Sequence, residues 1–557
     1  MRSRLNPFNL LLVSCWLICA FSAQAADPNF VGTHFSGSGN CSQCHDGMTD
    51  SQGNDLSIVN HWSNSMMANS TKDPYWRAKV ASELFRNPGL ADVINDKCTR
   101  CHAPMANDAM QKEQMSIAVL ESDNGVLNAA HPYHNQAMDG VSCTACHQIA
   151  NDDTLGTLDG FSGKYHILEY TDPLSRPIYG QFSNVRTNPM RNSVGFTPQY
   201  GSHMTESKVC ATCHNLKTPF VDANGNVMST TPESEFPEQM VFTEWQYSAF
   251  ADTTNSNAKT CQQCHMPVID DAVVIATTPP NLTPRNGFAK HTFLGANTLM
   301  MEIMDTYRDE LGVTATGFND AISATRTMLQ TSATLSIQDI SEDDDDILVT
   351  VKVTNNIGHK FPTSFPSRRA WIHFTATNEA GDIVFESGKL NANGSIVGNN
   401  GDADSSAFEP HYSEISTSDQ VQIYEPIMVD TDGAVTHTLL RAAAFVKDNR
   451  VLPTGFDKQT VPNDIAVKGA AFDDTDFVGG GDTVVYRLAK GSATSLNINA
   501  TLLYQTIAYG HIQDMFADAD QVTEIADFQA DELKTSLKTP ASCIAMQSDN
   551  VPFTLLS

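Results

Sequence analysis

Basic residues, long apolar runs and isolated cysteines are all scarce in this sequence, and each scarcity narrows what the protein can be. Among 557 residues, 34 Lys and Arg stand against 64 Asp and Glu, which gives a formal net charge of -30. This charge argues against binding to nucleic acid or to an anionic membrane surface. Beyond residue 25, no apolar run approaches the length needed to cross a bilayer. Beyond residue 20, only Cys543 lies outside five short cysteine motifs, which argues against a disulfide framework.

The first 25 residues have the pattern of a secretory signal peptide. An apolar run at residues 10–21 follows two arginines and leads to the small-residue sequence Ala23-Gln24-Ala25. Lipoprotein-type cleavage before Cys15 is less favoured, because it would leave apolar residues at the mature N-terminus. We therefore expect an exported protein that begins near Ala26 and works in the periplasm, at the cell surface or outside the cell.

One five-residue pattern, CxxCH, occurs five times between residues 41 and 265. In a c-type cytochrome the two thiols of this pattern bond to the vinyl groups of haem, and the histidine binds the iron from one side. We therefore expect five covalent haem c groups. The cysteines that would attach them are Cys41 and Cys44, Cys98 and Cys101, Cys143 and Cys146, Cys210 and Cys213, and Cys261 and Cys264. The proximal iron ligands would be His45, His102, His147, His214 and His265.

Two other uses of paired cysteines are less favoured. Zinc can be held by CxxC pairs, but a zinc ion needs only four ligands, and nothing in zinc binding places His directly after the second Cys each time. A redox CxxC motif normally occurs once, near a βαβ pattern. Five repeats of the full pattern favour haem over both.

Each iron also needs a ligand on its second side, which histidine usually supplies in low-potential multihaem proteins. Twelve histidines lie outside the motifs. The preferred distal ligands are His61, His134, His203, His291 and His359. In reserve are His131, His34 and His166. Met66 or Met67 is an alternative that would give a His/Met haem, although two methionines on a helix more often pack around a porphyrin.

The region from residue 26 to 331 is expected to form a mainly α-helical and irregular multihaem domain. Helical spacing occurs at residues 73–85 and 299–311, whereas residues 187–201 look irregular. Loops rich in Gly, Pro and Asn join such pieces. With so little protein for each cofactor, the haems themselves are expected to form much of the core.

The region from residue 332 to 557 is expected to form an antiparallel β-sandwich domain. Stretches of β-branched and aromatic residues alternate here with Asp, Asn and Gly turns, and no CxxCH motif is present. The expected strands lie at residues 347–354, 369–377, 421–424, 484–488 and 496–504.

One loop of this second domain is a candidate contact with the first. His359 lies in the sequence Gly358-His-Lys-Phe-Pro-Thr363, directly after the first of these strands. A histidine on a loop between Gly and Pro is well placed to reach across and bind a haem iron. The alternative is a solvent-exposed loop histidine.

Three acidic turns are candidates for binding calcium, because loops of oxygen ligands suit this ion. They lie at residues 343–346, 402–404 and 430–433. None has the EF-hand spacing, so ordinary solvated turns are the favoured interpretation.

Several segments resemble known exported cytochromes. These segments are Gly140-Val-Ser-Cys-Thr-Ala-Cys-His-Gln-Ile149, Cys210-Ala-Thr-Cys-His-Asn-Leu216, Cys264-His-Met-Pro267 and the Gly-His-Lys-Phe-Pro loop. They are similar to multihaem c-type cytochromes of the superfamily that includes cytochrome c-554 and hydroxylamine oxidoreductase. The resemblance implies stacked haem pairs, mostly with two His ligands, and electron transfer in the periplasm or at the cell surface. Two features differ from enzymes of this group: no motif has Lys in place of His, as in pentahaem nitrite reductases, and no pattern matches the crosslinked Tyr of hydroxylamine oxidoreductases.

Three functions are compatible with these features. The favoured one is electron transfer through five haems, in a respiratory or extracellular chain, with other redox proteins as partners. An enzyme is the alternative if one haem keeps an open side where a small nitrogen or sulfur compound binds. The third is self-association into a conducting cytochrome filament, since contacts that do not close on themselves produce fibres.

Overall fold

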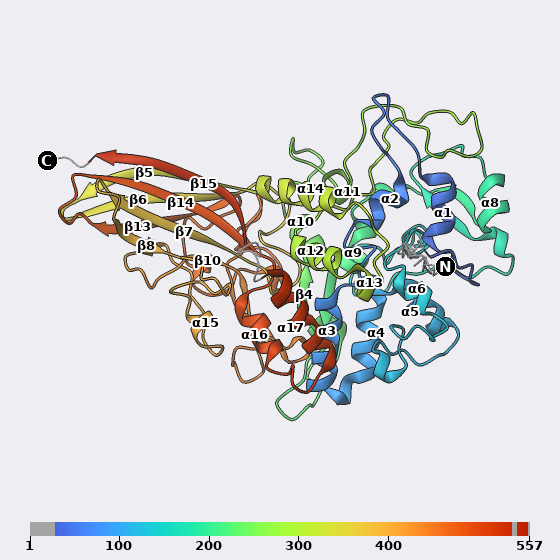
Figure 1. Cartoon of the computed structure of the whole chain (residues 1–557), viewed down its shortest axis with the longest axis horizontal. Coiled ribbons are helices and arrows are strands. Elements are labelled where there is room, and N and C mark those ends of the chain that lie inside the picture. Colours follow the sequence, from blue (N-terminus) through green and yellow to red (C-terminus); the bar gives the residue numbers. More distant parts are fainter. Residues whose placement is uncertain (1–27, 537–542, 555–557) are drawn as a thin grey trace, which may run out of the picture.

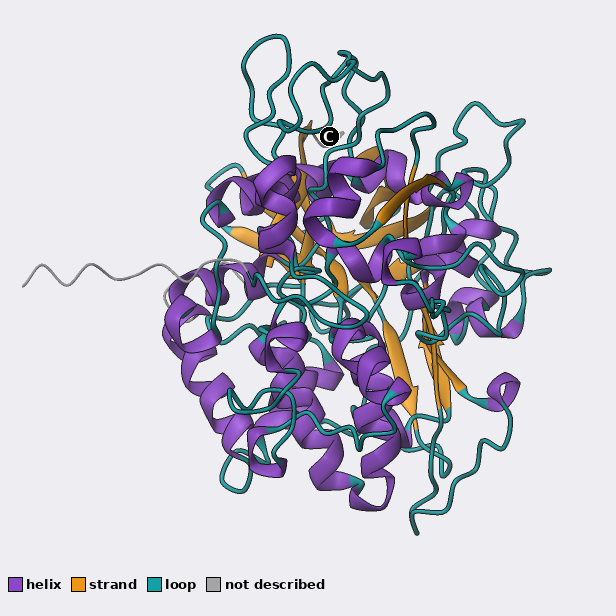
Figure 2. Ribbon diagram, turned by 90° about the vertical axis from the view of Figure 1, so that its right-hand side faces the viewer, coloured by secondary structure: helices purple, strands orange, loops and turns teal. Residues whose placement is uncertain are grey.

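The computed structural model describes residues 28–536 and 543–554, so the expected signal peptide at residues 1–25 lies outside the described residues. Figure 1 shows a helical, loop-rich half and a half built around long strands, and Figure 2, turned by 90°, shows the helices in front of the strands. None of the helices within the described ranges is long and apolar enough to cross a membrane.

The helical half consists of short helices joined by irregular segments. Its helices are α1 (Ser38–His45), α2 (Ile58–Ser63), α3 (Pro74–Arg86), α4 (Ala91–His102), α5 (Pro104–Lys112), α6 (His134–Met138), α7 (Cys143–Cys146), α8 (Asn188–Val194), α9 (Lys208–His214), α10 (Val241–Gln246), α11 (Cys261–His265), α12 (Thr298–Thr306), α13 (Arg308–Leu311) and α14 (Phe318–Thr331). Two small sheets lie among them, β1 (Pro177–Gly180) with β2 (Thr197–Tyr200) and β3 (Asn215–Thr218) with β4 (Phe236–Met240).

Local sequence signals explain where several helices begin and end. The Asp73 carboxylate accepts hydrogen bonds from the backbone N–H of Tyr75 at 2.9 Å and of Trp76 at 3.2 Å, so it caps α3. The helix expected at 73–85 is therefore present, and the one expected at 299–311 is divided into α12 and α13. The expectation of irregular structure at 187–201 is wrong. A proline in the first turn and a left-handed Gly195 at the end delimit α8 there, and β2 follows.

Each CxxCH motif lies on a short helix. Helices α1, α4, α9 and α11 end at the motif histidine, and α7 ends one residue before it. Residues i, i+3 and i+4 share one face of a helix. The two cysteines and the histidine of each motif therefore lie on a common side, as one covalently attached haem requires.

Two larger sheets surround one hydrophobic core in the second half. Their strands are β5 (Ala333–Asp343), β6 (Asp346–Asn355), β7 (Arg369–Asn378), β8 (Ile383–Ser387), β9 (Glu414–Ile415), β10 (Ile423–Tyr424), β13 (Gly481–Ala489), β14 (Ser495–Gln505) and β15 (Cys543–Thr554). The strand order is β10-β7-β14-β15 in one sheet, with β8 paired to β7, and β5-β6-β13-β9 in the other. Neighbouring strands are antiparallel except β9, which is parallel to β13.

Residues from both sheets meet in this core. Val351 of β6, Phe374 of β7 and Ile498 of β14 are all fully buried in it. The rings of Phe374 and Tyr486, the latter on β13, stack with their centroids 3.9 Å apart. All five expected strands are present, although the one expected at 421–424 is shortened to β10. A separate hairpin is formed by β11 (Pro426–Val429) and β12 (Ala444–Asp448), and α15 (Asn400–Ala403) lies in a connecting loop.

Two helices that follow β14 return to the helical half. They are α16 (Tyr509–Phe516) and α17 (Thr523–Ser536), and Figure 1 shows them beside α3. Ile525 and Phe528 of α17 are buried in one cluster with Trp76 of α3 and Met300 of α12. The chain beyond residue 332 therefore completes part of the helical core, which its strand-rich sequence pattern did not indicate.

A buried network of four charges joins the two halves. Arg450 lies 2.8 Å from Glu244 of α10 and 2.8 Å from Asp448, and the Lys360 ammonium lies 2.7 Å from Asp448. The backbone N–H of Lys360 also donates to Glu244, at 3.2 Å. Burial by itself would raise the pKa of Asp448, but Arg450 and Lys360 hold it well below its usual value. The two positive and two negative charges balance, and they fix the segment that includes His359.

We expect Asp448→Asn to lower the free energy of unfolding by about 3 kcal/mol or more, because it leaves Lys360 and Arg450 buried without their shared counter-charge. Denaturant titration of the exported holoprotein, followed by circular dichroism, measures this loss. The matched control is Asp343→Asn, which removes one exposed partner of Arg487 and should cost less than about 1 kcal/mol. Equal unfolding midpoints for the two variants would show that the network does not stabilise the fold.

Candidate functional site

The ten motif cysteines are unpaired, and their thiols meet across motifs. The pairs within hydrogen-bonding reach are Cys41 with Cys143, Cys101 with Cys213, and Cys210 with Cys261. Cys146 also lies close enough to Cys213 for the two charges to interact. In space, the first motif therefore adjoins the third, and the fourth motif adjoins the second, third and fifth.

The motif residues are not arranged as a zinc site. Within residues 28–536 and 543–554, one group of three or more His, Cys, Asp or Glu side chains has ligand atoms within 4.8 Å of one another. That group is His411, Asp474 and Asp482, none of which belongs to a motif. A structural zinc site would need four such ligands in one place.

Four motif histidines share one hydrogen-bond pattern. Their Nδ1 atoms lie within hydrogen-bond distance of backbone carbonyl oxygens: His45 with Ile275 at 2.9 Å, His102 with Ser70 at 3.1 Å, His147 with Tyr179 at 2.5 Å, and His265 with Leu294 at 2.5 Å. Because a carbonyl can only accept, Nδ1 carries the hydrogen and Nε2 keeps a free lone pair. This tautomer binds a metal through Nε2 while the carbonyl fixes the orientation of the ring.

His214 of the fourth motif is surrounded by protein but still accessible to solvent. Burial lowers its pKa to about 4, with nearby His265 and Arg368 adding to the effect. Its side chain is nevertheless exposed to solvent. Cys264 behaves similarly, since burial raises the pKa of its thiol although the residue is exposed. Space therefore remains beside these two side chains, as expected where a large cofactor binds inside the protein. The thiol and the imidazole are the donor groups that haem c uses.

Two of the expected distal histidines lie opposite motif histidines. The rings of His147 and His291 are 6.3 Å apart between centroids and inclined by 22°, and those of His265 and His359 are 6.4 Å apart and inclined by 13°. Two imidazoles that bind one metal from opposite sides, at about 2 Å each, have centroids separated by roughly this distance. His291 and His359 also have Nδ1 3.0 Å from carbonyl oxygens, so that Nε2 is free in each.

The His359 loop is held tightly against the helical half. Burial lowers the pKa of His359 to about 4, so the imidazole is neutral at pH 7. A Cβ atom at Gly358 would lie 3.0 Å from Phe250 and 3.1 Å from Trp245, which leaves no room for a side chain. His359 is therefore partly buried against the helical half and is not a solvent-exposed loop histidine.

The other three preferred histidines have different surroundings. Nδ1 of His61 is buried without a partner, and its Nε2 lies 3.6 Å from Asp55. Nδ1 of His134 is 3.0 Å from the carbonyl of Val126. His203 is fully buried, and its Nε2 is bound to a carbonyl at 3.0 Å, so Nδ1 is the nitrogen left without a partner.

The reserve histidines lie in more polar settings. His166 is 57% exposed and forms an ion pair with Asp152 at 2.7 Å. Nδ1 of His131 accepts a hydrogen bond from the backbone N–H of Tyr133 at 3.2 Å. Burial lowers the pKa of His34, and Lys112 lowers it further.

Trp76 is a site residue that the sequence analysis missed. Its ring stacks on His102 with centroids 4.8 Å apart and an angle of 11° between the planes. The indole Nε1–H is buried and has no hydrogen-bond partner. Trp76 belongs to a helix that the sequence predicts, but no local pattern indicates which motif the helix faces.

The acidic turns proposed for calcium already use their carboxylates. Arg487 pairs with Asp343 and Asp346 at 3.0 and 3.2 Å. Arg369 pairs with Asp402 at 2.7 Å. Asp430 accepts the backbone N–H groups of its own turn.

A family match over part of the chain supports haem binding. Residues 40–148, which contain the first three motifs, match the family model described as cytochrome c554 and c-prime. No curated protein matches the sequence significantly. Among solved structures, the chain is similar to a penta-heme cytochrome c552 from Thermochromatium tepidum, with 15% sequence identity and a TM-score of 0.49, over 94% of this chain and 99% of the other.

Five CxxCH motifs on helices that place thiols and imidazole on one face, together with the family match of residues 40–148, support a multihaem c-type cytochrome.

Proposed function

We propose that the protein carries electrons through five covalently bound haem c groups and exchanges them with other redox proteins. The observation that carries this proposal is the meeting of motif thiols from distant parts of the sequence. Haem supplies one-electron oxidation and reduction when it is bound. The chain's own contribution is to hold five attachment points as one connected group, with Cys210–His214 at its centre.

The paired histidines supply the proposed axial ligands for two of these haems. His147 and His291 would hold the haem of the third motif, and His265 and His359 that of the fifth. The carbonyl partners of all four Nδ1 atoms orient the rings. Burial lowers the pKa of each of these imidazoles and so keeps it neutral. For the remaining three haems, His61, His134 and His203 are the proposed ligands, with His131, His34 and His166 as substitutes.

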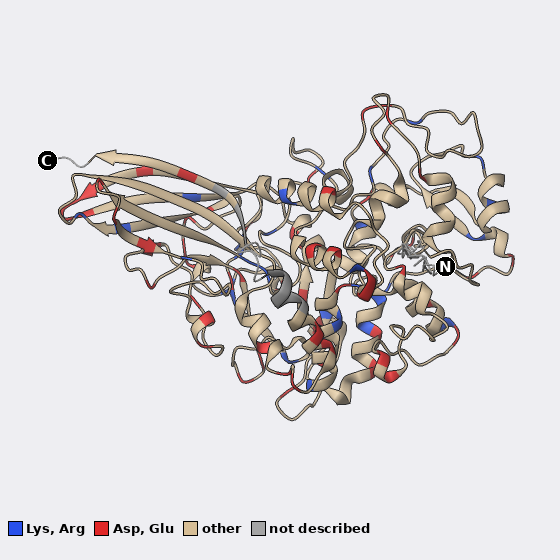
Figure 3. Ribbon diagram, in the orientation of Figure 1, with Lys and Arg blue, Asp and Glu red and all other residues tan. Residues whose placement is uncertain are grey.

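The proposal extends to the domains and to the cellular location. Residues 26–331 would form the haem domain and residues 332–557 an antiparallel β-sandwich domain that contributes His359. Figure 3 shows Asp and Glu spread over both halves of the molecule. This acidic surface favours partners with positively charged patches and stabilises ferric iron. The protein would act after export, in the periplasm or at the cell surface.

One observation favours an enzyme as the second candidate. At the second motif, the aromatic partner of His102 is Trp76 rather than another histidine. An indole is a donor only and cannot bind iron, and its close stacking on His102 places it beside this ligand rather than across an iron from it. The second motif is therefore where we would place an open haem that acts on a small nitrogen or sulfur compound.

We expect the intact mass of the exported protein to include five haem groups. The double variant Cys98→Ala/Cys101→Ala should retain four, because covalent attachment needs the thiols of each motif. The Cys543→Ala variant serves as the control and should retain five. A wild-type mass with any other number of haems contradicts the pentahaem proposal.

We expect His359→Ala to keep all five haems, since every attaching thiol is unchanged. One haem of five should become high-spin or take a different ligand, with a shifted reduction potential, because an axial ligand is lost. Optical and electron paramagnetic resonance spectra with a redox titration measure both effects. His373→Ala, which removes a histidine paired with Glu386 and outside the candidate ligands, is the control. If the His359→Ala variant has the same spectrum and reduction potentials as the wild type, His359 is not a haem ligand. The β-rich half then has no role at the haem.

The spectrum of the oxidised wild-type protein separates the two candidate functions. Electron transfer with two ligands on every iron predicts a wholly low-spin spectrum, whereas an open second-motif haem predicts one high-spin haem in five. If a high-spin signal is present, it should be missing from the Cys98→Ala/Cys101→Ala variant, which lacks the second-motif haem. A wholly low-spin spectrum would eliminate the enzyme.

A further inference from the structure

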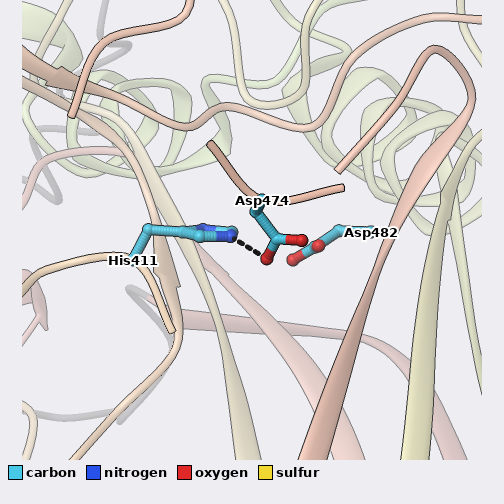
Figure 4. A group of neighbouring side chains, drawn as sticks. All are labelled: His411, Asp474 and Asp482. Atoms are coloured by element: carbon cyan, nitrogen blue, oxygen red, sulfur yellow. Dashed lines mark hydrogen bonds and ion pairs between the residues drawn. The ribbon is translucent and has the colours of Figure 1, made fainter. Parts of the chain in front are cut away.

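A group of acidic side chains lies in the β-rich half, away from the haem motifs. Figure 4 shows the carboxylates of Asp474 and Asp482 turned toward one another, with His411 beside them. One ligand atom from each of these three residues lies within 4.8 Å of the others. The Asp476 carboxyl is also within hydrogen-bonding reach of the Asp474 carboxyl. Three carboxylates and an imidazole therefore share one small region.

The hydrogen bonds of His411 exclude it as a metal ligand. Its Nδ1 accepts from the side-chain amides of Gln422 at 2.8 Å and Asn449 at 3.1 Å. The oxygen and nitrogen atoms of these two amides cannot be exchanged, because the oxygens accept the backbone N–H groups of Tyr412 and Glu425. Nδ1 is thus unprotonated, and Nε2 carries the hydrogen that it donates to Asp474 at 3.1 Å. With neither nitrogen available, only oxygen atoms remain as ligands.

Asp482 provides a second, independent indication of a missing partner. The residue is 1% exposed. Its Oδ2 accepts from the Tyr424 hydroxyl at 2.7 Å and from Gln422 at 3.2 Å. Its Oδ1 is buried and has no hydrogen-bond partner. An unpaired carboxylate oxygen at such depth costs stability unless a cation or a proton compensates it.

We propose that Asp474, Asp476 and Asp482 bind one hard divalent cation of the calcium type through their oxygens, while His411 orients Asp474 from behind. Oxygen ligands in flexible geometry are what calcium prefers, whereas zinc and copper favour a free imidazole nitrogen. Carbonyl oxygens and water would complete the coordination.

The charges around the group agree with a site that needs a cation. Burial raises the pKa of Asp482 to about 7, with Asp474 and Asp476 contributing. Burial and the neighbouring Asp474 carboxylate raise the pKa of Asp476 to about 6. The ammonium of Lys458 is close by, but it donates to the backbone carbonyls of Ala471 and Asp474. The three carboxylates thus repel one another, and a bound cation would relieve that repulsion.

The site would fasten a long loop that contacts the haem-binding half. Asp474 and Asp476 lie in the connection between β12 and β13, and Asp482 is the second residue of β13. The same connection contains Thr454, whose carbonyl accepts the backbone N–H of Ala249 at 2.7 Å. A cation at the base of this loop would therefore stabilise the contact between the two halves as well as the sheet.

Calorimetric titration with Ca²⁺ tests the proposal on the exported holoprotein, after treatment with EDTA and in about 0.15 M salt to screen the acidic surface. We expect saturable binding of one Ca²⁺ and a rise in the thermal unfolding midpoint. Asp482→Asn should weaken binding at least tenfold. Because Asp482 is buried, Asp476→Asn is the second variant; its side chain is exposed, so it should fold normally and still weaken binding.

The control is Asp343→Asn, which alters an acidic turn that pairs with Arg487 and should bind Ca²⁺ as the wild type does. Three results would overturn the proposal. They are no saturable Ca²⁺ binding by the wild type, unchanged binding by both Asp482→Asn and Asp476→Asn, or strong preference for Zn²⁺ that is lost in His411→Gln.

Discussion

The buried ion network of Glu244, Lys360, Asp448 and Arg450 is the contact on which the relation between the two halves depends. Charges at this depth are tolerated only because each has an opposite partner within hydrogen-bonding distance. Lys360 is the neighbour of His359, so the same contacts that neutralise its ammonium also position the imidazole. The absence of a side chain at Gly358 lets the loop approach Trp245 and Phe250 closely. The contacts that hold the β-rich half against the helical half therefore also position His359, a candidate iron ligand.

The helical half follows a different principle, because its helices are too short to bury much apolar surface on their own. Most have fewer than ten residues, and isolated helices of that length are unstable in water. The five motif helices bring thiols together from positions that are far apart in the chain. The fourth motif has neighbours on three sides, which gives the group a centre and makes it branched rather than linear. A branched group offers more than one route by which electrons can enter or leave.

Three groups of carboxylates in the described part of the chain differ in burial and pairing. In each acidic turn, at least one carboxylate is paired with arginine or accepts backbone N–H groups. Asp448 and Glu244 are buried with full charge compensation. Asp482 is buried without it, and its repulsion by Asp474 and Asp476 adds to the cost. Burial and pairing, rather than the number of acidic residues, separate a candidate cation site from a solvated surface.

The sequence by itself determined the cofactor chemistry, because CxxCH is a local pattern whose spacing on a helix already places two thiols and an imidazole on one side. It also determined the strands, whose alternating side chains are equally local, and the α3 helix, whose cap is Asp73. The flanking residues predict His291 and His359 as distal ligands, and their rings lie 6.3 and 6.4 Å from the rings of His147 and His265.

Only the tertiary structure decided which motifs are neighbours, that α16 and α17 complete the helical core, and that Trp76 stacks on His102. It also brings together Asp474, Asp476 and Asp482, the residues of the proposed cation site, which are not the turns richest in Asp. All of these features depend on contacts between residues far apart in the chain. The acidic group depends in addition on a buried oxygen of Asp482 that has no hydrogen-bond partner. No local sequence pattern encodes such contacts.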